Sequence, residues 1–287
     1  MRGERDEMNK PEWLRKKIRL SDQAEMKVLL EEGGLHTICE EAVCPNIGEC
    51  FAQKVATFMI LGTSCTRLCS FCAVDKDKPL PPDPREPQKV AWAVRTLGLK
   101  HVVITSPTRD DLFDGGADHF AAVVRAISEE NPQTAVELLI PDMKEKEESL
   151  RTVARSGAVI IGHNLETVPR LYRIRSSADY LRSLRVLEKL SVLNPLIKTK
   201  SGIMLGLGER DDEVLSLMKD LREAGCSYLS IGQYLSPSQR HESVNEYVLP
   251  ERFERLGEVG RALGFAYVQS SPYTRSSYMA HRYRRNQ

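Results

Sequence analysis

The sequence predicts an α/β fold that is built on a parallel sheet. From Thr57 onward, short apolar runs, often β-branched, alternate with longer amphipathic segments, which is typical of consecutive strand–helix units. Such connections are right-handed and leave neighbouring strands parallel. Six units are too few for a closed eight-stranded barrel. The pattern therefore favours a partial barrel of the TIM type, with an open, doubly wound sheet as the alternative.

The predicted elements follow in order along the chain. The six strands are residues 57–61, 101–105, 135–140, 159–162, 198–205 and 228–233. The six helices are residues 86–97, 117–129, 147–155, 179–193, 211–224 and 250–263. Ahead of them, residues 11–32 are predicted to form a charged helix that packs on the domain, and Gly33-Gly34 ends it. Residues 76–87 contain five prolines and are predicted to be an irregular connection.

Composition and charge limit the classes of function. The chain has 287 residues, 41% of them hydrophobic, which is ample for one large domain or a barrel with extensions. A formal net charge of +1 gives no overall bias toward nucleic acid or membrane surfaces. No apolar run approaches the length that spans a bilayer, and residues 1–10 resemble no targeting signal. We therefore expect a cytoplasmic protein with no nucleic-acid or membrane partner.

Six of the seven cysteines lie in two triplets. The first is C-x4-C-x5-C at Cys39, Cys44 and Cys50, in a segment rich in Pro, Asn and Gly that is predicted to be a loop. The second is C-x3-C-x2-C, which directly follows the first predicted strand; its members are Cys65, Cys69 and Cys72. Clustered cysteines in a chain without a secretion signal indicate metal binding rather than disulfides. The seventh, Cys226, is predicted to be buried in the core.

Thiolates are soft ligands that select zinc, cuprous copper or iron–sulfur clusters. A structural zinc site is normally closed by four ligands. Three cysteines on a four-iron cluster would instead leave one iron open for chemistry. The alternatives are a zinc site that borrows a histidine, or reduced cysteines with a structural role.

Polar residues follow several predicted strands, at the ends where barrel enzymes place their active sites. They are found in residues 105–111 and 163–166, at Met204, and at Gln233-Tyr234. Gathered at one face, they would suit a charged, nucleoside-like ligand.

Each of these signals also has a simpler interpretation. Asn164 and Glu166 could cap and start a helix. Residues 109–111, Arg-Asp-Asp, could form a solvated turn, and Arg175 could be surface charge.

The second triplet, with Phe71 before its last cysteine, resembles the signature of radical S-adenosylmethionine enzymes. The wider sequence, from about residue 11 to residue 280, resembles the lipoyl synthase family. The matching segments are residues 35–50, 58–62, 163–172, 199–202, 231–235 and 275–278. The first triplet together with Arg-Ser-Ser-Tyr at 275–278 is the specific part of this resemblance.

The resemblance implies a partial (β/α)6 barrel of the TIM type with a further strand near residues 265–270. It implies three parts: an N-terminal extension, 1–55, with an auxiliary cluster; a barrel, 56–265; and a C-terminal strand and tail, 266–287. The tail would supply a serine ligand, Ser277, to the auxiliary cluster on Cys39, Cys44 and Cys50, with Ser276 left open as the alternative.

The cofactors implied are two [4Fe-4S] clusters and S-adenosylmethionine. The cluster on Cys65, Cys69 and Cys72 would bind and cleave S-adenosylmethionine, so that a 5′-deoxyadenosyl radical removes hydrogen from an unactivated C–H bond. The cofactor contacts implied are Phe71, Asn164, Glu166 and Arg175.

The activity implied is that of a sulfurtransferase of lipoate biosynthesis. It would insert two sulfur atoms at C6 and C8 of an octanoyl-lysine and use the auxiliary cluster as sulfur donor. The partners implied are octanoylated lipoyl carriers, namely 2-oxoacid dehydrogenase E2 subunits and the glycine cleavage H protein, and an electron donor such as flavodoxin or ferredoxin. A biotin synthase-like sulfur inserter and a non-catalytic iron–sulfur carrier are the alternatives.

Overall fold

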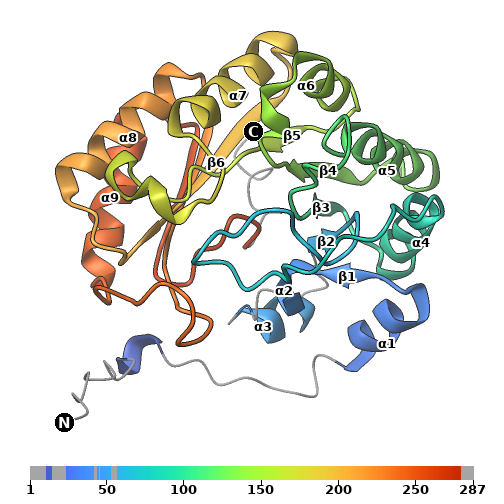
Figure 1. Cartoon of the computed structure of the whole chain (residues 1–287), viewed down its shortest axis with the longest axis horizontal. Coiled ribbons are helices and arrows are strands. Elements are labelled where there is room, and N and C mark those ends of the chain that lie inside the picture. Colours follow the sequence, from blue (N-terminus) through green and yellow to red (C-terminus); the bar gives the residue numbers. More distant parts are fainter. Residues whose placement is uncertain (1–10, 15–23, 42–43, 45, 53–56, 279–287) are drawn as a thin grey trace.

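A curved sheet of eight strands forms the centre of the molecule. The computed structural model describes residues 11–14, 24–41, 44, 46–52 and 57–278. In these ranges the strands lie side by side in chain order, and β1 and β8 are the two edges of the sheet. Figure 1 shows helices α4 to α9 in a layer around the outside of the curve. This arrangement is the predicted partial barrel, because a doubly wound sheet would reverse its strand order.

The strands are β1 (His36–Thr37), β2 (Thr57–Met59), β3 (His101–Thr105), β4 (Ala135–Leu139), β5 (Ile160–Gly162), β6 (Lys198–Leu205), β7 (Tyr228–Gln233) and β8 (Tyr267–Ser270). All six predicted strands and the further strand near the C-terminus are confirmed. Neighbouring strands from β2 to β8 are parallel. Strand β1 pairs antiparallel with β2. It could not be predicted, because two residues are too few to show an alternation of apolar and polar side chains.

The outer helices are α4 (Glu86–Leu97), α5 (Ala117–Glu130), α6 (Glu147–Ala154), α7 (Tyr180–Leu193), α8 (Asp211–Glu223) and α9 (Pro250–Ala262), and all six were predicted. Two 3-10 helices, η3 (Met143–Glu145) and η4 (Pro169–Ile174), follow β4 and β5. None of the helices in the described ranges is long and apolar enough to cross a membrane.

The N-terminal part differs from its prediction in two respects. The charged helix expected at residues 11–32 consists of η1 (Glu12–Leu14) and α1 (Ala24–Gly33), while residues 15–23 lie outside the described residues. The loop predicted for the first cysteine triplet is wrong for Cys39 and Cys50, which lie in α2 (Ile38–Glu41) and α3 (Ile47–Ala52). Local helical hydrogen bonds, such as Cys50 N to Asn46 O at 2.9 Å, override the turn-forming composition.

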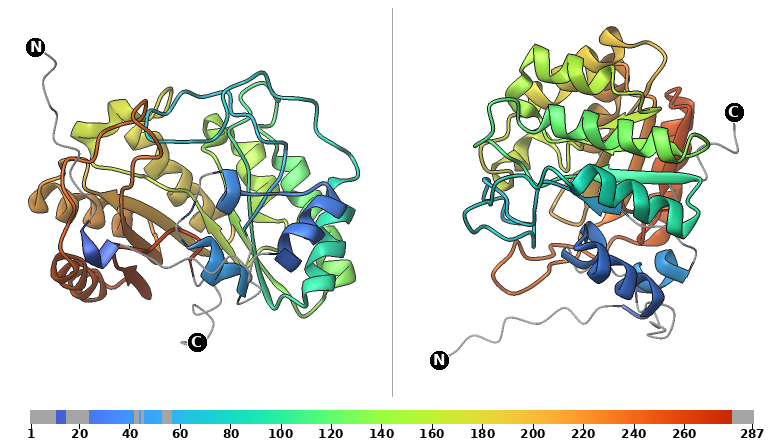
Figure 2. Two further views of the ribbon diagram at one scale, coloured as in Figure 1. Left: turned by 90° about the horizontal axis from the view of Figure 1, so that it is seen from below. Right: turned by 90° about the vertical axis from the view of Figure 1, so that its right-hand side faces the viewer.

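Successive side chains of a strand point to opposite faces of the sheet, so that the outer face is apolar and the interior is polar. Val136 and Leu138 of β4 pack under the helices in the larger apolar core. Glu137, between them, faces inward, where its carboxylate lies 2.7 Å from the ammonium of Lys200 on β6. Charged side chains therefore occupy part of the inside of the barrel. The views in Figure 2 show the helices stacked on the outer side of the sheet.

Cys226 is fully buried in the second apolar core, between the helices and the C-terminal half of the sheet. Burial raises the pKa of its thiol to about 12. This placement confirms the prediction that Cys226 is a core residue.

Replacing Cys226 with Ala should lower the free energy of unfolding by about 1 kcal/mol, because it removes a small buried group and leaves a small cavity. Chemical denaturation measures this change. The iron bound per chain should stay the same, and a loss of iron would identify Cys226 as a ligand.

Candidate active site

One cavity of about 560 Å³ lies at the ends of the barrel strands and is lined by every residue predicted to bind a cluster or the cofactor. Those residues are Cys39, Cys44, Cys50, Cys65, Cys69, Phe71, Cys72, Asn164, Glu166, Arg175 and Ser277. The volume is typical of sites for small molecules and cofactors. Met204, Gln233 and Tyr234, which were expected near the site, also line it.

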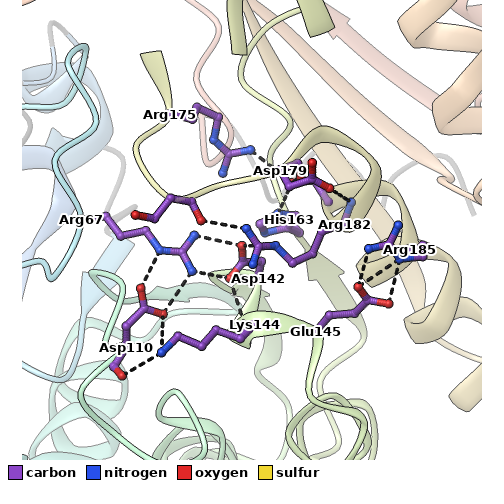
Figure 3. Close-up of polar contacts among 12 residues, drawn as sticks. Arg67, Asp110, Asp142, Lys144, Glu145, His163, Arg175, Asp179, Arg182 and Arg185 are labelled. Carbon is purple, nitrogen blue, oxygen red and sulfur yellow. Dashed lines mark hydrogen bonds and ion pairs between the residues drawn. The ribbon is translucent and has the colours of Figure 1, made fainter. Parts of the chain in front are cut away.

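The second cysteine triplet lies in a loop after β2 that is held by a buried arginine, Arg67. Its guanidinium donates to Asp110 at 2.8 Å and to Asp142 at 2.6 Å. Figure 3 shows these carboxylates converging on Arg67. Since Asp110 follows β3 and Asp142 follows β4, Arg67 ties the cysteine loop to the ends of two neighbouring strands.

Asp142 is a buried carboxylate with two cationic partners. Arg182, at the start of α7, lies 3.2 Å from it on the side away from Arg67. Burial by itself would raise the pKa of Asp142, but the hydrogen bonds and charge of Arg67 lower it to about 2. The ion pairs therefore stay charged at neutral pH. These ion pairs could not be predicted, because no local pattern in the sequence distinguishes Arg67 from an exposed arginine.

Asn164 and Glu166 follow β5 and do not cap a helix, so that interpretation is wrong. The next helix, η4, begins after Val168. Asn164 Nδ2 donates to Glu166 Oε1 at 3.1 Å. Glu166 has a left-handed backbone, with φ of 68°, that is pinned by hydrogen bonds to Gly202 and Met204 of β6. Such conformations in residues other than glycine concentrate at functional sites.

Arg175 is not surface charge. Its Nη1 donates to the carbonyl of Asn164 at 2.9 Å and also bonds to the hydroxyl of Tyr172. Burial raises the pKa of Glu166, and the charge of Arg175 opposes that rise. Arg175 thus stabilises the loop that follows β5, and it also lines the cavity.

Arg109 is not in a solvated turn either, since its side chain is only 1% exposed. It donates to the carbonyl of Leu61 at 2.7 Å and pairs with Asp111 at 2.8 Å. Arg109 therefore fixes the end of β2 from outside the cavity. Gln233 also has a structural role, because its amide bonds to the backbone of Glu246 and Val248.

The C-terminal segment packs against the first cysteine triplet. Asn46 donates to the carbonyl of Tyr273 at 2.7 Å across 227 positions of sequence, and Tyr278 donates to Glu49 at 2.9 Å. The segment also passes very close to β7, where a Cβ on Gly232 would lie 2.0 Å from the carbonyl oxygen of Thr274. The tail serines are thereby brought to the same cavity as the cysteines.

The two tail serines differ in their surroundings. Ser276 Oγ accepts a hydrogen bond from Asn164 Nδ2 at 2.7 Å, and its carbonyl accepts one from Lys200. Lys200 is itself paired with Glu137 inside the barrel. Both serines line the cavity together with Cys39, Cys44 and Cys50, but the side chain of Ser276 is bonded to Asn164 of the barrel.

Known proteins resemble this chain over almost its whole length. Residues 59–221 match the Radical SAM superfamily. Lipoyl synthase of Geobacter metallireducens is 60% identical over 96% of this chain and 98% of that protein. Lipoyl synthase of Caldanaerobacter subterraneus is 54% identical over 95% and 96%, respectively. The chain belongs to the lipoyl synthase family.

Solved structures agree on the fold of this lipoyl synthase family member. Methylornithine synthase superposes with a TM-score of 0.57 at 14% identity, over 74% of this chain and 70% of that one. The FeFe-hydrogenase maturase HydG of Carboxydothermus hydrogenoformans gives 0.58 at 15% identity, over 71% and 50%. At such low identity these similarities concern the fold alone.

Membership of the lipoyl synthase family confirms the predicted enzyme class, a radical S-adenosylmethionine sulfurtransferase that uses four-iron clusters, one of them auxiliary. It overturns both alternatives, the biotin synthase-like enzyme and the non-catalytic carrier. The expected fold is confirmed at the same time.

The side chains that line the cavity are of the kinds that bind these cofactors. Six thiols in two groups are the ligands that iron–sulfur clusters take. In the described part of the chain, no three His, Cys, Asp or Glu side chains are placed to hold a single metal ion. Buried polar atoms without a hydrogen-bonding partner occur on five residues that line the cavity: Lys76, Ser106, Asn164, Arg175 and Ser230.

Burial raises the pKa of three of these thiols. Burial, together with the nearby Cys44 and Cys50, raises the pKa of Cys39 to about 12. Burial also raises the pKa of Cys69, against the charge of Arg175, and that of Cys72, against the charge of Lys76. Because clusters bind thiolates, loading of iron must displace these protons.

Replacing Arg67 with Met should lower the free energy of unfolding by about 3 kcal/mol, since it leaves buried Asp142 with a single cation. It should also reduce the iron retained per chain, because the cysteine loop loses its anchor. Chemical denaturation and iron analysis measure both effects.

The matched control is Arg85→Met, which removes an arginine that is 80% exposed and pairs only with Asp83. This variant should change the free energy of unfolding by less than about 0.5 kcal/mol. Equal effects in the two variants would contradict the anchoring role of Arg67.

Proposed function

We propose that this chain inserts sulfur at C6 and C8 of an octanoyl chain that is attached to a lysine of a carrier protein. The observation that supports this most is the single cavity that both cysteine triplets line together with Ser277. A sulfur source and a hydrogen-abstracting centre must both reach the same carbon atoms. Two separate sites would not meet that requirement.

Cys65, Cys69 and Cys72 would ligate the cluster that binds S-adenosylmethionine. When bound, this cluster and S-adenosylmethionine supply the cleavage of the C–H bonds, and the auxiliary cluster supplies the sulfur. Phe71 would lie against the bound cofactor. Asn164 and Glu166 are bonded to each other, and Arg175 is bonded to the backbone of Asn164; all three line the cavity. We assign these three residues to the polar groups of S-adenosylmethionine.

Cys39, Cys44 and Cys50 would ligate the auxiliary cluster, with Ser277 as the oxygen ligand. The contacts of Asn46 and Glu49 with the tail hold the serine segment beside these cysteines. The engagement of Ser276 with Asn164 favours Ser277 over its neighbour. A hydroxyl is a harder ligand than thiolate, so it would close the cluster without holding its iron firmly.

The remaining lining suits a saturated acyl chain. Apolar side chains from α2 and from the ends of β4 and β6 line the cavity; they include Ile38, Leu139, Ile140, Ile203 and Met204. Such a surface binds an eight-carbon chain by excluding water. It offers no acid or base to the chain, so the side chains here position the substrate and leave the bond cleavage to the cofactor.

The substrates proposed are octanoylated lipoyl carriers, both 2-oxoacid dehydrogenase E2 subunits and the glycine cleavage H protein. Electrons would come from a flavodoxin or a ferredoxin. The cysteines cluster in a pattern typical of metal ligands rather than of disulfides, which supports a reducing, cytoplasmic location. The proposed division is an extension at 1–55, a barrel at 56–265 and a tail at 266–287.

The two triplets should be separable in function. Cys69→Ala should abolish formation of 5′-deoxyadenosine, because S-adenosylmethionine loses its cluster. Cys44→Ala should retain that cleavage but transfer no sulfur. Both products are measured with an octanoyl-lysine peptide under reducing, anaerobic conditions. Lipoyl product from the Cys44 variant would refute the sulfur-donor assignment, and absence of product from the unaltered enzyme would refute the proposed function.

Ser277→Cys should keep a stable auxiliary cluster but impair sulfur insertion, because a thiolate holds iron more firmly than a hydroxyl. Ser277→Ala should leave a more labile cluster. Iron content and the yields of singly and doubly thiolated peptide measure these effects, with Ser276→Ala as the matched control. Unchanged yields from Ser277→Cys would show that weak ligation is irrelevant, and effects confined to Ser276 would move the role to that residue.

A further inference from the structure

The loop that carries the second cysteine triplet has an exposed side outside the cavity. Leu68 lies between Cys65 and Cys69, two of the proposed cluster ligands, and its apolar side chain is 66% exposed. Cys65 and Cys69 line the cavity, but Leu68 does not. The molecular surface at Leu68 is therefore next to a cluster ligand in the chain and is not part of the substrate cavity.

Ion pairs connect this loop to a lysine of the neighbouring strand-end segment. Arg67, which precedes Leu68, binds the carboxylate of Asp110 at 2.8 Å. Lys144 of η3 donates to the backbone carbonyl of Asp110 at 3.2 Å. Figure 3 shows Arg67 and Lys144 both directed at Asp110. The ammonium of Lys144 is therefore held beside the cysteine loop.

Further cations follow along the same surface. Glu145 pairs with Arg185 at 2.8 Å and with Lys189 at 2.7 Å, both on α7. The ammonium of Lys146 lies 4.0 Å from the ring centre of Phe113, which is 83% exposed. What we call the cationic surface consists of Leu68, Phe113, Lys144, Lys146, Arg185 and Lys189.

The cationic surface has an excess of positive charge next to water. Lys144 and Arg185 are 51% and 47% exposed, whereas the carboxylates they approach, Asp110 and Glu145, are 21% and 16% exposed. The whole chain has a formal net charge of only +1, so the excess is local. An acidic partner would therefore meet the cations first. Five cations share the three carboxylates of Asp110, Asp142 and Glu145, namely Arg67, Lys144, Arg182, Arg185 and Lys189, and Lys146 adds a sixth positive charge.

The position of the cationic surface distinguishes between two kinds of partner. A protein that presents an octanoyl-lysine must bring the acyl chain into the cavity, but none of the six residues of this surface lines the cavity. A protein that delivers only electrons needs to approach the cluster ligands and does not enter the cavity. Electron-transfer encounters use small interfaces, in which opposite charge speeds association. The observations therefore favour an electron donor.

We propose that the cationic surface docks a small acidic protein that carries single electrons. The assignment rests on the proposed function and deepens it, because it places the electron donor at Leu68 and the cations beside it. In each encounter the reduced carrier loses one electron, and the cluster on the second triplet gains it. The electron is used to cleave S-adenosylmethionine into methionine and a 5′-deoxyadenosyl radical, so no proton or other atom crosses the interface.

The test compares two reductants on protein with reconstituted clusters, under anaerobic conditions. Reduced flavodoxin is the acidic carrier, and dithionite is a small reductant that needs no docking surface. The variant combines Lys144→Gln with Arg185→Gln. Each of the carboxylates affected keeps a second cation, Arg67 or Lys189, so the fold should be retained.

Stopped-flow absorbance follows the oxidation of reduced flavodoxin by each protein. At low ionic strength the double variant should oxidise flavodoxin about tenfold more slowly than the unaltered protein, because the encounter loses its electrostatic attraction. The difference should shrink in about 0.5 M salt, which screens the charges. Formation of 5′-deoxyadenosine with dithionite should be unchanged.

Two controls complete the experiment. Arg125→Gln with Arg155→Gln removes the same charge from an outer groove between α5 and α6 and should leave both rates unchanged. Leu68→Ser keeps the charge but removes an apolar contact, so it should slow the oxidation of flavodoxin about threefold and leave the reaction with dithionite unchanged. Iron content and visible absorbance are measured for every variant, so that a lost cluster is recognised.

The outcomes separate this assignment from the proposed function. If the double variant is slowed equally with both reductants or with neither, or if the control at Arg125 and Arg155 is slowed as much, the assignment is overturned. It is also overturned if the double variant, reduced by dithionite, loses sulfur transfer to the octanoylated glycine cleavage H protein, because the surface then binds the carrier of the substrate.

If the unaltered protein forms no 5′-deoxyadenosine with dithionite, the proposed function fails first. If the oxidation of flavodoxin depends on the cationic surface as expected but the octanoyl peptide gains no sulfur, the assignment stands and the proposed reaction is wrong.

Discussion

The guanidinium of Arg67 joins the cysteine loop after β2 to the carboxylates of Asp110 and Asp142 at the ends of β3 and β4. Thr66 and Ser70 also bond the loop to distant segments, at Thr108 and Glu242, and to these hydrogen bonds Arg67 adds two ion pairs. Two carboxylates fix both the position and the orientation of a planar guanidinium. The position of the second triplet therefore depends on the spacing between β3 and β4, which the sheet holds rigidly.

The tail depends on a second buried pair, formed inside the barrel. Lys200 joins Glu137 to the carbonyl of Ser276, and His101 lies 3.1 Å from the other oxygen of Glu137. Burial by itself would raise the pKa of Glu137, but Lys200 and His101 lower it. Charges in such a place are favourable only when each has its partners. Their presence explains how a segment with little apolar surface can be held in one place.

The cavity is complementary to a bound group in its polar atoms as well as in its shape. Folded proteins usually satisfy their buried polar atoms, so the unpartnered ones on residues that line this cavity are available to the polar groups of a ligand. The apolar part of the cavity wall lies beside these polar atoms and suits an acyl chain, which loses its contact with water on binding. In the function we propose, polar recognition of a nucleoside and apolar recognition of an acyl group would share this one cavity, which both triplets line.

The sequence alone determined the six strands from β2 to β7 and their order, because short apolar runs alternate with amphipathic segments, and it set six cysteines apart from the seventh, because they lie in two closely spaced triplets. It could not decide between Ser276 and Ser277, nor separate Arg67, Arg109 and Lys76 from exposed cations. Those distinctions depend on contacts between residues far apart in the chain, such as Asn164 with Ser276 and Arg67 with Asp142. Only the tertiary structure sets burial and partner for each charge, because local sequence carries no information about which distant carboxylate will lie beside a given cation.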